Sequence, residues 1–576
     1  WYQWFVPAPM RIIPRPLVSI AFCAHSRAKR VICSSGTPVI ALMQDQVAAL
    51  TQMGVAAAAV NSAIPPHEAR ETERRLRAGE LDLVYVAPER LLTEPFLYQL
   101  DHARVALFAI DEAHCVSQWG HDFRPEYRGL AVLAERFPGV PRLALTATAD
   151  GPTRDDILAH LDLQAGRVFA SGFDRPNIQY RVAPKENPKV QIKRLLDRHH
   201  GAAGIVYCGT RARVDDWARW LNDQGVPALP YHAGLDAETR AANQRRFLRE
   251  DGVVMVATVA FGMGIDKPDV RFVAHLDLPK SLEAYYQETG RAGRDGLPAE
   301  AWMVWGVQDV GRLRQFIIAS EAAEEQKRVE RSKLDALLGY CETAGCRRQV
   351  LLSYFGDHCE PCGNCDTCLA PPETFDGTQA VQKALSAVYR TGQMFGQGHI
   401  VDVLTGADTE RIRKFAHDRL PTYGVGGEFS KTEWRGILRQ IIALGLLEVD
   451  VAGHGGLHLG PDCRPVLRGE RTIELRRPPQ GRAAATARRG SSSDGLLEDP
   501  ADRALFERLR ALRMDLAKAQ GVPPYVVFGD RTLVEMARER PRDLNDLAGL
   551  YGVGAAKLDR YGADFLAVIA TEGEAP

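Results

Sequence analysis

The chain has 576 residues, of which 45% are hydrophobic and 25% are charged, and its 72 basic side chains nearly balance 73 acidic ones. This composition excludes a chain that is disordered throughout, and the length predicts about four domains. Because the net charge is only −1, any nucleic-acid-binding surface must be local.

Membrane insertion is not expected, because no apolar run approaches the roughly 18 residues of a membrane span. Of the 11 cysteines, five lie between residues 346 and 368, and four of these are spaced like metal ligands, which favours a metal site in a reducing compartment over a disulfide framework. We therefore expect a cytoplasmic protein with no membrane partner.

Residues 1–36 differ from the rest of the chain. They hold five basic side chains and no acidic one, and their apolar residues follow no period. Four prolines, the first of them Pro7, break any amphipathic helix of a mitochondrial presequence, and a secretory apolar core is missing. We interpret this segment as anomalous, out of frame or wrongly assembled; a genuine divergent N-terminus is the alternative.

Residues 37–172 alternate short apolar runs with helical patterns, which predicts an α/β domain with a parallel sheet. The apolar run 105–110 ends in Asp111 and Glu112, at the kind of strand end where ligands bind. Asp111 can hold Mg²⁺ through its water shell, Glu112 can activate a water aimed at a γ-phosphate, and His114 is a relay candidate. Alternatively, the two carboxylates only cap the next helix.

Groups suited to stacking on unpaired bases follow the acidic pair. They are Gln118, Trp119, His121, Phe123, Arg124 and Tyr127. The stretch DEAHCVSQWGHDFRPEY, residues 111–127, resembles motif II and the aromatic-rich loop of RecQ-type DNA helicases. The resemblance implies that this loop couples strand binding to nucleotide hydrolysis. A cluster that only fills the core is the alternative.

Residues 37–47 resemble the segment that follows the first strands of a RecQ motor. That family carries a glutamine-bearing adenine motif and a phosphate loop, G-x-x-x-x-G-K-S/T, before this segment, and the sequence contains neither. The backbone N–H groups and the lysine of such a loop cradle the phosphates, and its hydroxyl completes Mg²⁺ coordination. ATP turnover by this chain as written is therefore in doubt.

The run at residues 142–149 predicts another strand and resembles helicase motif III. Thr146 and Thr148 would then form hydrogen bonds around the carboxylates and respond to the bound phosphate. Two β-branched residues also simply favour a strand, so the motif is weak by itself.

Residues 173–320 form a second alternating block, which predicts a second lobe. Within it, residues 257–266 resemble motif V. Gly262 and Gly264 are placed where backbone must pass close to a ligand, and the resemblance adds Asp266 to the nucleotide site.

Residues 286–294 resemble motif VI, with Gln287 beside two arginines. Arg291 and Arg294 are three residues apart, so on one helical turn they would share a face. A guanidinium suits the spread charge of a phosphoryl-transfer transition state. We predict that Arg294 is the arginine finger and Arg291 its companion; two solvated surface arginines are the alternative.

A cysteine cluster lies in residues 321–372. Cys346, Cys362, Cys365 and Cys368 have the spacing C-x15-C-x2-C-x2-C, which suits tetrahedral zinc. An iron–sulfur cluster uses the same ligands, but the surrounding sequence resembles the RecQ zinc module. With four positions filled, the role would be structural. Cys359 is a competing ligand or, like the other spare cysteines, a free thiol.

Residues 373–475 combine helical spacing with an alternating stretch at 446–459 that has a glycine-rich tip, which predicts a winged helix. The segment resembles the RecQ C-terminal (RQC) domain, which implies that the hairpin contacts duplex DNA at a fork. His454 would lie at the tip, and a turn histidine with no role is the alternative.

Residues 476–499 are basic and rich in Gly and Ser, which predicts a flexible linker. Helical spacing over residues 500–572 predicts a small helical bundle. This segment resembles the HRDC domain, an accessory module that binds DNA weakly. Tyr525 is its stacking candidate, although a core tyrosine is at least as compatible.

Together the motifs resemble a RecQ-type ATP-dependent DNA helicase, with two RecA-like lobes followed by a zinc module, a winged helix and a helical bundle. The resemblance implies 3′ to 5′ unwinding in DNA repair and recombination, with ATP, Mg²⁺ and Zn²⁺ as cofactors. It implies a monomer that acts on single-stranded and forked DNA, with a single-strand-binding protein or repair proteins as partners. A non-hydrolysing fork-binding scaffold is the alternative, and an RNA helicase fits the accessory modules less well.

Overall fold

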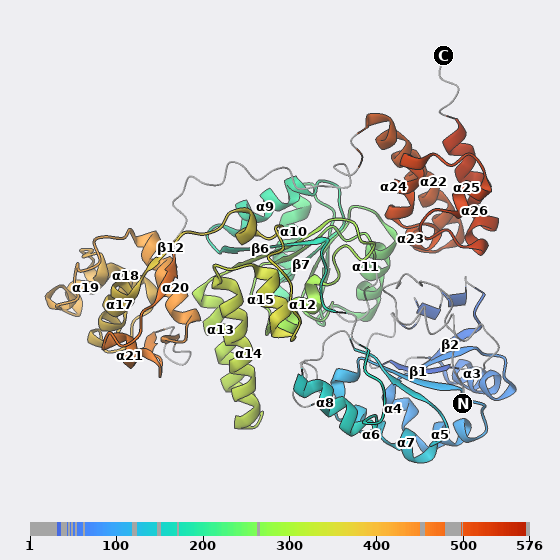
Figure 1. Cartoon of the computed structure of the whole chain (residues 1–576), viewed down its shortest axis with the longest axis horizontal. Helices are drawn as coiled ribbons and strands as arrows, with labels where there is room; N and C mark the ends of the chain where they lie inside the picture. The colour runs from blue at the N-terminus through green and yellow to red at the C-terminus, as the bar shows by residue number, and fades with distance from the viewer. Residues whose placement is uncertain are drawn as a thin grey trace. The chain divides into compact units, whose positions relative to one another are not determined.

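The computed structural model forms two compact units, residues 1–170 with 263–265 and residues 171–262 with 266–576 (Figure 1). The structure describes residues 31–35, 43, 46–47, 50–51, 54–61, 64–117, 124–146, 151–169, 172–261, 265, 267–449, 456–477, 497 and 499–571. Within these ranges, no helix is both long and apolar enough to cross a lipid bilayer.

The first unit is built on a parallel sheet whose strand order is β2-β3-β1-β4-β5. The strands are β1 (Val31–Ser35), β2 (Ala57–Val60), β3 (Leu83–Val86), β4 (Leu107–Asp111) and β5 (Arg142–Ala144). Strand β1 comes from the first 36 residues of the chain and pairs with both β3 and β4. Strand β4 therefore lies inside the sheet, as the apolar run at 105–110 predicts.

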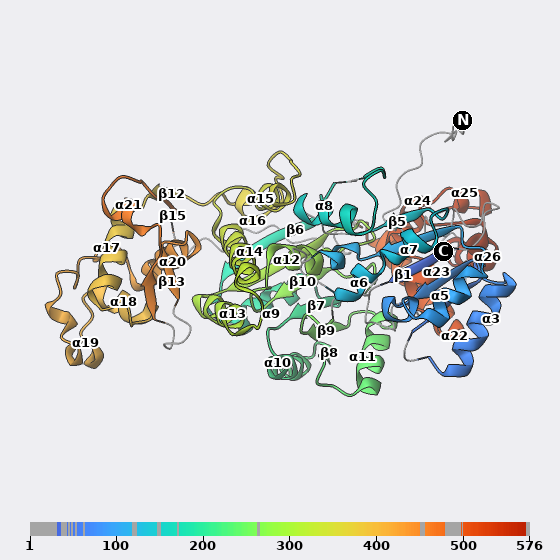
Figure 2. The same ribbon diagram turned by 90° about the horizontal axis from the view of Figure 1, so that it is seen from below.

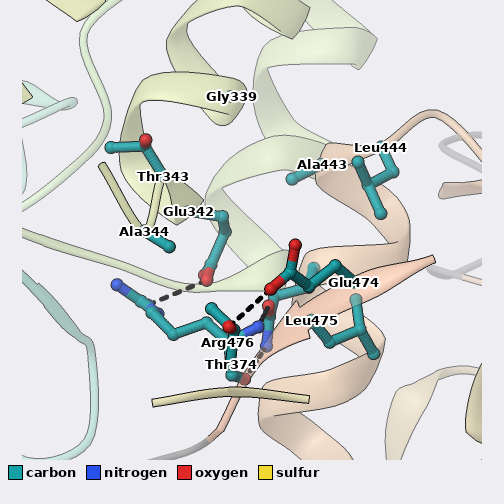
Figure 3. A pocket seen from close by; sticks show the side chains of 11 residues that line it. Gly339, Glu342, Thr343, Ala344, Thr374, Ala443, Leu444, Glu474, Leu475 and Arg476 are labelled. Carbon is teal, nitrogen blue, oxygen red and sulfur yellow. Dashed lines mark hydrogen bonds and ion pairs between the residues drawn. The ribbon is translucent and has the colours of Figure 1, made fainter. Parts of the chain in front are cut away.

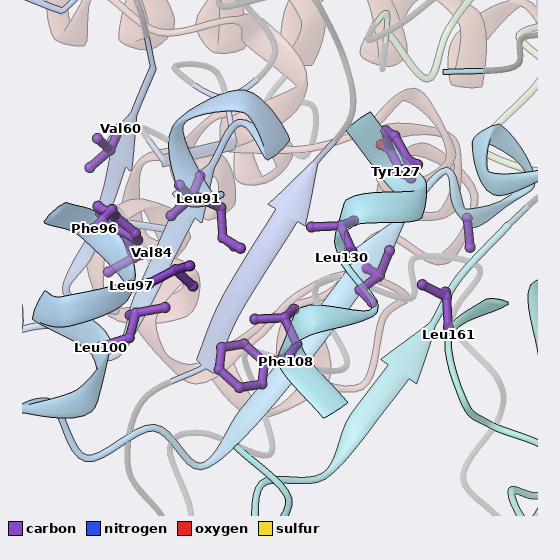
Figure 4. Packing of buried hydrophobic residues seen from close by; sticks show 14 of the residues in the cluster. Val60, Val84, Leu91, Phe96, Leu97, Leu100, Phe108, Tyr127, Leu130 and Leu161 are labelled. Carbon is purple, nitrogen blue, oxygen red and sulfur yellow. The ribbon is translucent and has the colours of Figure 1, made fainter. Parts of the chain in front are cut away.

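Helices connect these strands. They are α3 (Pro66–Ala78), α4 (Pro88–Leu91), α5 (Glu94–Asp101), the 3₁₀ helix η1 (Ala113–Val116), α6 (Pro125–Gly129), α7 (Val132–Arg136) and α8 (Gly151–His160). Alternate residues of the strands enter separate cores, with Val84 and Phe108 in one and Leu83 and Ala109 in the other. Figure 4 shows Val84 and Phe108 packed with Leu97, Leu100 and Leu130. Cores on both faces explain why the strands are apolar throughout.

The second unit begins with another parallel sheet, in the order β6-β11-β10-β7-β9-β8. Its strands are β6 (Ile178–Pro184), β7 (Gly204–Tyr207), β8 (Ala228–Tyr231), β9 (Val254–Ala257), β10 (Phe272–His275) and β11 (Ala299–Trp305). The associated helices are α9 (Pro188–Arg198), α10 (Arg211–Asp223), α11 (Ala237–Arg249) and α12 (Leu282–Thr289). This sheet confirms the predicted second α/β block.

Four helices lead from this sheet through the cysteine cluster. They are α13 (Val307–Ala319), α14 (Glu324–Glu342), α15 (Arg347–Tyr354) and α16 (Asp366–Leu369). Helix α14 packs along α12 and α13, and its buried residues include Leu334, Leu337 and Tyr340. The cysteine cluster is thereby joined to the sheet domain by a continuous helical core.

The next segment has helices and a short antiparallel hairpin, and α17 packs against both α18 and α20 (Figure 2). Its elements are β12 (Thr374–Asp376), α17 (Thr378–Arg390), α18 (Gln397–Leu404), α19 (Glu410–Lys414), η2 (His417–Arg419), α20 (Lys431–Ala443), β13 (Leu447–Val449), β14 (Leu457–Leu459), α21 (Cys463–Leu467) and β15 (Glu474–Arg476). Strands β13 and β14 confirm the predicted hairpin.

The last part of the second unit is a bundle of five helices among the residues described there. They are α22 (Pro500–Gln520), α23 (Pro524–Val527), α24 (Asp530–Glu539), α25 (Leu544–Ala548) and α26 (Ala555–Ala570). Leu505, Leu509, Leu533 and Phe565 are buried in its core. The predicted small helical bundle is confirmed.

Candidate functional site

The acidic pair of the first unit lies at the carboxyl end of β4. The backbone N–H of Glu112 donates to the Asp111 carboxylate over 2.9 Å. Glu112 itself adopts a left-handed conformation, with φ 50° and ψ 39°, which is rare for a residue with a side chain. Such local strain is typical of functional sites. The chain turns here into η1, so both carboxylates are held at the edge of the sheet.

Burial raises the pKa of Asp111, and the hydrogen bond from Glu112 offsets only part of that rise. A buried carboxylate with this bias gains from a neighbouring cation, because the cation favours the charged form. Carboxylate oxygen is also a preferred ligand of Mg²⁺. The residues present therefore fit a magnesium ion held at Asp111.

His114 links the acidic pair to the neighbouring strand. Its Nδ1 atom lies 3.4 Å from a carboxylate oxygen of Glu112 and 3.0 Å from the hydroxyl of Thr146. Strand β5 pairs with β4 immediately before this point, which brings Thr146 alongside. The structure thus brings together four of the predicted residues: Asp111, Glu112, His114 and Thr146. Thr148 lies outside the described residues.

The segment after the acidic pair is described only in part. Tyr127 is buried in α6, and its hydroxyl donates to the backbone carbonyl of Asp111 over 3.1 Å. Burial raises the pKa of this hydroxyl. Tyr127 therefore belongs to the core of the first unit, and its hydroxyl contacts the backbone at the end of β4 (Figure 4). Its predicted role in stacking on DNA is not supported by this burial.

Arg124 belongs to the same aromatic and basic loop. Arg124 is half-buried, and its backbone N–H donates to the carbonyl of Cys115 over 2.9 Å. The other predicted DNA-contacting residues of the loop lie outside the described residues: Gln118, Trp119, His121 and Phe123.

The two predicted arginines of the second unit follow α12. That helix ends at Thr289, and a series of turns carries Arg291 and Arg294. Gly293 permits these turns, because its φ of 56° is left-handed. We expected Arg291 and Arg294 to share one face of a helical turn. This expectation is wrong, because both residues follow the end of α12 and lie in non-helical turns. Arg291 is buried, whereas Arg294 is exposed.

Gln287 lies half-buried on α12 itself. Its neighbour Glu288 accepts a hydrogen bond from Nε2 of His275 over 2.7 Å, and the His275 ring stacks on Tyr207. These buried contacts fix the helix that precedes the arginines. The predicted motif V residues, Gly262, Gly264 and Asp266, lie outside the described residues.

Two residues that the sequence analysis missed hold the arginine turn. The Arg175 guanidinium donates to the carbonyls of Gly290, Ala292 and Gly293 over 2.8–3.1 Å. The side-chain amide of Asn177 donates to the carbonyl of Gly293 over 2.8 Å. Both residues come from the segment before β6, more than 100 residues earlier in the chain. No local pattern signals such a contact.

The four predicted metal ligands come together in the second unit. The ligand atoms of Cys346, Cys362, Cys365 and Cys368 all lie within 4.8 Å of one another. The Cys362–Cys368 and Cys346–Cys365 sulfur distances are both 4.0 Å. Tetrahedral Zn–S bonds of about 2.3 Å place sulfurs about 3.8 Å apart. The cluster therefore fits a zinc ion, and Cys359 is not part of the group.

A buried arginine ties this cluster to the sheet. Arg347 donates to the Asp366 carboxylate over 2.5 Å and to the carbonyl of Tyr340 over 2.8 Å. The other oxygen of Asp366 accepts from the backbone N–H of Val182 in β6 over 2.9 Å. The cysteine module is therefore fixed to β6, an edge strand of the second-unit sheet.

The remaining DNA-contact candidates lie in the last two modules. His454 lies outside the described residues, between β13 and β14. Tyr525 is half-buried in α23.

A cavity of about 230 Å³ lies between α14 and the winged-helix segment (Figure 3). Glu342 accepts from Arg476 over 2.9 Å and from Arg439 over 3.3 Å beside it. Gln440 exchanges two hydrogen bonds of 2.7 Å with the backbone of Arg476. These contacts join the helix of the cysteine module to the winged helix.

Five known domain families match the chain in order. They are the DEAD/DEAH box helicase family over residues 17–157, the helicase conserved C-terminal domain over 188–296, RecQ zinc-binding over 307–369, the RQC domain over 371–484 and the HRDC domain over 502–569. The two parallel sheets are thus RecA-like helicase lobes, and the later modules are the zinc-binding, winged-helix and HRDC domains.

Whole-length relatives agree with this order. The ATP-dependent DNA helicase RecQ of Pasteurella multocida is 43% identical over 92% of this chain and 84% of its own length. Its counterpart in Haemophilus influenzae is 42% identical over 92% of this chain and 86% of its own length. The Bacillus subtilis protein is 38% identical, with 92% and 87% covered. The chain therefore belongs to the RecQ family of ATP-dependent DNA helicases.

Proposed function

We propose that this protein unwinds forked DNA in the 3′ to 5′ direction and acts in DNA repair and recombination. Family membership supplies ATP and Mg²⁺ as cofactors of the motor, and the RecQ zinc-binding module with its four cysteines supplies Zn²⁺. The observation that carries the proposal is the acidic pair at the end of β4, with Glu112 in a strained conformation beside His114.

In the proposed reaction, Asp111 would hold a magnesium ion, which would offset charge on the phosphates. Glu112 accepts a proton from the water that attacks the γ-phosphate. His114 and Thr146 hold the Glu112 carboxylate in place and respond to the state of the phosphate. The contacts of 3.4 and 3.0 Å around the His114 ring support this positioning role.

Arg294 is the proposed arginine finger. Its exposure leaves the guanidinium accessible to a phosphate, whereas Arg291 is buried and is better suited to shaping the turn. The carbonyl contacts of Arg175 keep that turn rigid. An arginine finger that is carried by a rigid turn needs little reorganisation when the phosphate is transferred.

The missing phosphate loop limits the chemistry proposed for these 576 residues. No segment of the sequence matches G-x-x-x-x-G-K-S/T. Without the lysine and backbone N–H groups of that loop, the β- and γ-phosphates lose their main contacts. We propose that ATP turnover by this chain is weak, and that joining a phosphate-loop segment to it restores turnover.

Unwinding polarity is tested with two DNA duplexes of equal sequence, one with a 3′ single-stranded tail and one with a 5′ tail. The chain joined to a phosphate-loop segment is expected to unwind the 3′-tailed duplex with ATP and Mg²⁺, and to leave the 5′-tailed duplex intact. Equal unwinding of both, or a preference for the 5′ tail, contradicts the proposed direction. A matching RNA duplex tests whether DNA is the preferred substrate.

A second candidate is a fork-binding scaffold that hydrolyses no ATP, and the missing phosphate loop favours it. In that case this chain binds forked DNA equally well with and without ATP. Its ATP hydrolysis then stays at background in the presence of DNA and is the same in the Glu112→Gln variant. DNA-stimulated hydrolysis by this chain that Glu112→Gln abolishes overturns the scaffold proposal.

Further expectations concern partners and assembly. The RQC and HRDC matches support DNA binding outside the motor lobes. We propose single-stranded and forked DNA as the ligands, a single-strand-binding protein or repair proteins as partners, and a monomer as the working form. Light scattering of the purified chain with and without forked DNA tests the monomer.

A further inference from the structure

The terminal bundle meets the second-unit sheet through charged side chains. The Arg510 guanidinium of α22 donates to the Asp251 carboxylate over 2.8 Å, and Arg513 lies 3.7 Å from the same oxygen. Asp251 lies in the connection between α11 and β9. The bundle therefore contacts the edge from which the parallel strands of this sheet start.

The charges continue on both sides of this contact. In the bundle, Arg513 is 2% exposed and donates to Asp530 over 2.7 Å. At the sheet edge, Arg271 pairs with Asp295 over 2.5 Å. Burial alone would raise the pKa of Asp530, but Arg513, and then Arg271 from the sheet edge, outweigh it and lower the pKa to about 2. The charged form of Asp530 in the bundle is thus favoured by Arg271 of the second-unit sheet domain.

The ion pair between Arg271 and Asp295 lies at the turn that carries Arg294, the proposed arginine finger. Asp295 follows Arg294 in the chain, and its carboxylate accepts from the backbone N–H of Leu297 over 3.1 Å. A Cβ atom added to Gly296 would lie 3.6 Å from a guanidinium nitrogen of Arg531 in α24. Arg531 of the bundle therefore lies beside Gly296, at the end of the turn that carries Arg294.

We propose that the terminal bundle is a reversible intramolecular clamp, which docks on this edge through Asp251 and restrains the turn at residues 291–297. The contacts named above are between charged or polar groups, and a Gly- and Ser-rich linker precedes the bundle. Ion pairs that are partly exposed weaken with salt, because the Debye length falls from about 10 Å at 0.1 M to about 3 Å at 1 M. The Arg510 and Asp251 side chains are 29% and 16% exposed, so docking should weaken as ionic strength rises, although less than a fully exposed pair would.

The consequence for ATP turnover rests on the proposed function, but docking itself does not. In the docked state Arg175 donates to carbonyls of the turn beside Arg294, and Arg531 of the bundle lies beside Gly296 at the end of that turn. Release removes Arg531 from Gly296 and leaves the Arg175 contacts. We expect the released turn to move more, so that the arginine finger reaches its phosphate less often.

The test is hydrogen exchange of the full chain, without nucleotide, for Arg510→Glu. Reversing this charge places two carboxylates together, and we expect backbone amides of residues 291–297 to exchange about fivefold faster at about 0.05 M salt. About 0.5 M salt should raise exchange of the unchanged chain toward the same level and should hardly affect the variant. The readout requires no ATP, so its failure is distinct from failure of the proposed function.

Two further variants separate docking from folding. Lys518→Glu makes a similar charge reversal at an exposed position of α22 and should leave exchange unchanged. The double exchange Asp251→Arg with Arg510→Glu restores opposite charges and should return exchange to the original level. Unaltered exchange in Arg510→Glu, or no recovery in the double variant, overturns the proposal.

Discussion

Glu300 shows at the residue scale how the second-unit sheet stabilises a buried charge. Its side chain is 3% exposed and accepts from His199 over 3.0 Å and from Arg198 over 2.7 Å. Burial alone would raise its pKa, but hydrogen bonds from His199 and Arg198 outweigh burial and lower the pKa to about 2. The charged form of Glu300 therefore stabilises the folded sheet.

We expect Glu300→Gln to lower the free energy of unfolding by about 3 kcal/mol near pH 7, the value for a pKa shifted from 4.5 to about 2. Because the folded-state pKa is depressed, this stabilisation is full above about pH 4.5 and is lost as pH falls toward 2. Urea unfolding followed by tryptophan fluorescence at several pH values measures it.

Glu186→Gln, at an exposed position of the same unit, serves as the control and should cost little at any pH. The difference between Glu300→Gln and the unchanged chain should shrink below pH 4.5. A difference that is as large at pH 3 as at pH 7 would show that lost packing, and not charge, causes the effect.

Arg175 donates to three backbone carbonyls of the arginine turn, so its replacement tests how that turn is held. We expect Arg175→Lys to fail as a replacement, since a lysine is a single point charge and cannot reproduce the planar fork. Hydrogen exchange of residues 290–297 should rise about tenfold in Arg175→Lys. Arg194→Lys, on the exposed face of α9, should leave exchange unchanged. Equal protection in the two variants contradicts the role.

At the element scale, the cysteine module depends on its metal, because α15 and α16 are too short to be stable alone. We expect the purified chain to hold one zinc per molecule and Cys365→Ser to lose it, with local unfolding of the module. Mass spectrometry for metals measures the content. Visible absorbance with iron in place of zinc would indicate an iron–sulfur cluster.

Cys359→Ser supplies the matched control for this element. Cys359 is outside the group of four sulfurs, so its loss should leave zinc bound. If Cys359→Ser and Cys365→Ser release the metal equally, the assignment of four ligands is wrong.

Most elements could be predicted from local patterns. The apolar run at 105–110 gave β4, and the alternating stretch at 446–459 gave β13 and β14. The end of α12 at Thr289 could not be predicted from arginine spacing, because Gly290 and the left-handed Gly293 decide it. Spacing found all four cysteines of the cluster, since Cys362, Cys365 and Cys368 follow one another at intervals of three residues.

Contacts between distant segments were beyond prediction from the sequence. The bonds of Arg175 to the arginine turn join residues more than 100 positions apart, and the pairing of Arg510 with Asp251 joins residues 259 positions apart. A tyrosine in an aromatic and basic loop suits stacking on bases. In the folded unit, however, Tyr127 is buried and its hydroxyl donates to the backbone carbonyl of Asp111. Burial and long-range bonding depend on the folded sheet.

At the scale of the whole molecule, the order of domains matches the RecQ family from the first lobe to the HRDC domain. In the proposed mechanism, the first RecA-like lobe supplies the acidic pair and the second RecA-like lobe supplies the arginines. Opening and closing of such lobes during each ATP cycle would move the protein along a DNA strand. The account therefore requires that hydrolysis depend on the acidic pair.

DNA-stimulated ATP hydrolysis by the chain joined to a phosphate-loop segment tests this requirement most directly. We expect Glu112→Gln to slow the hydrolysis by about a hundredfold or more, because the variant cannot accept the proton of the attacking water. Glu135→Gln, at an exposed position of α7 in the same unit, should retain the full rate. Equal rates for the joined chain and its Glu112→Gln variant would contradict the account.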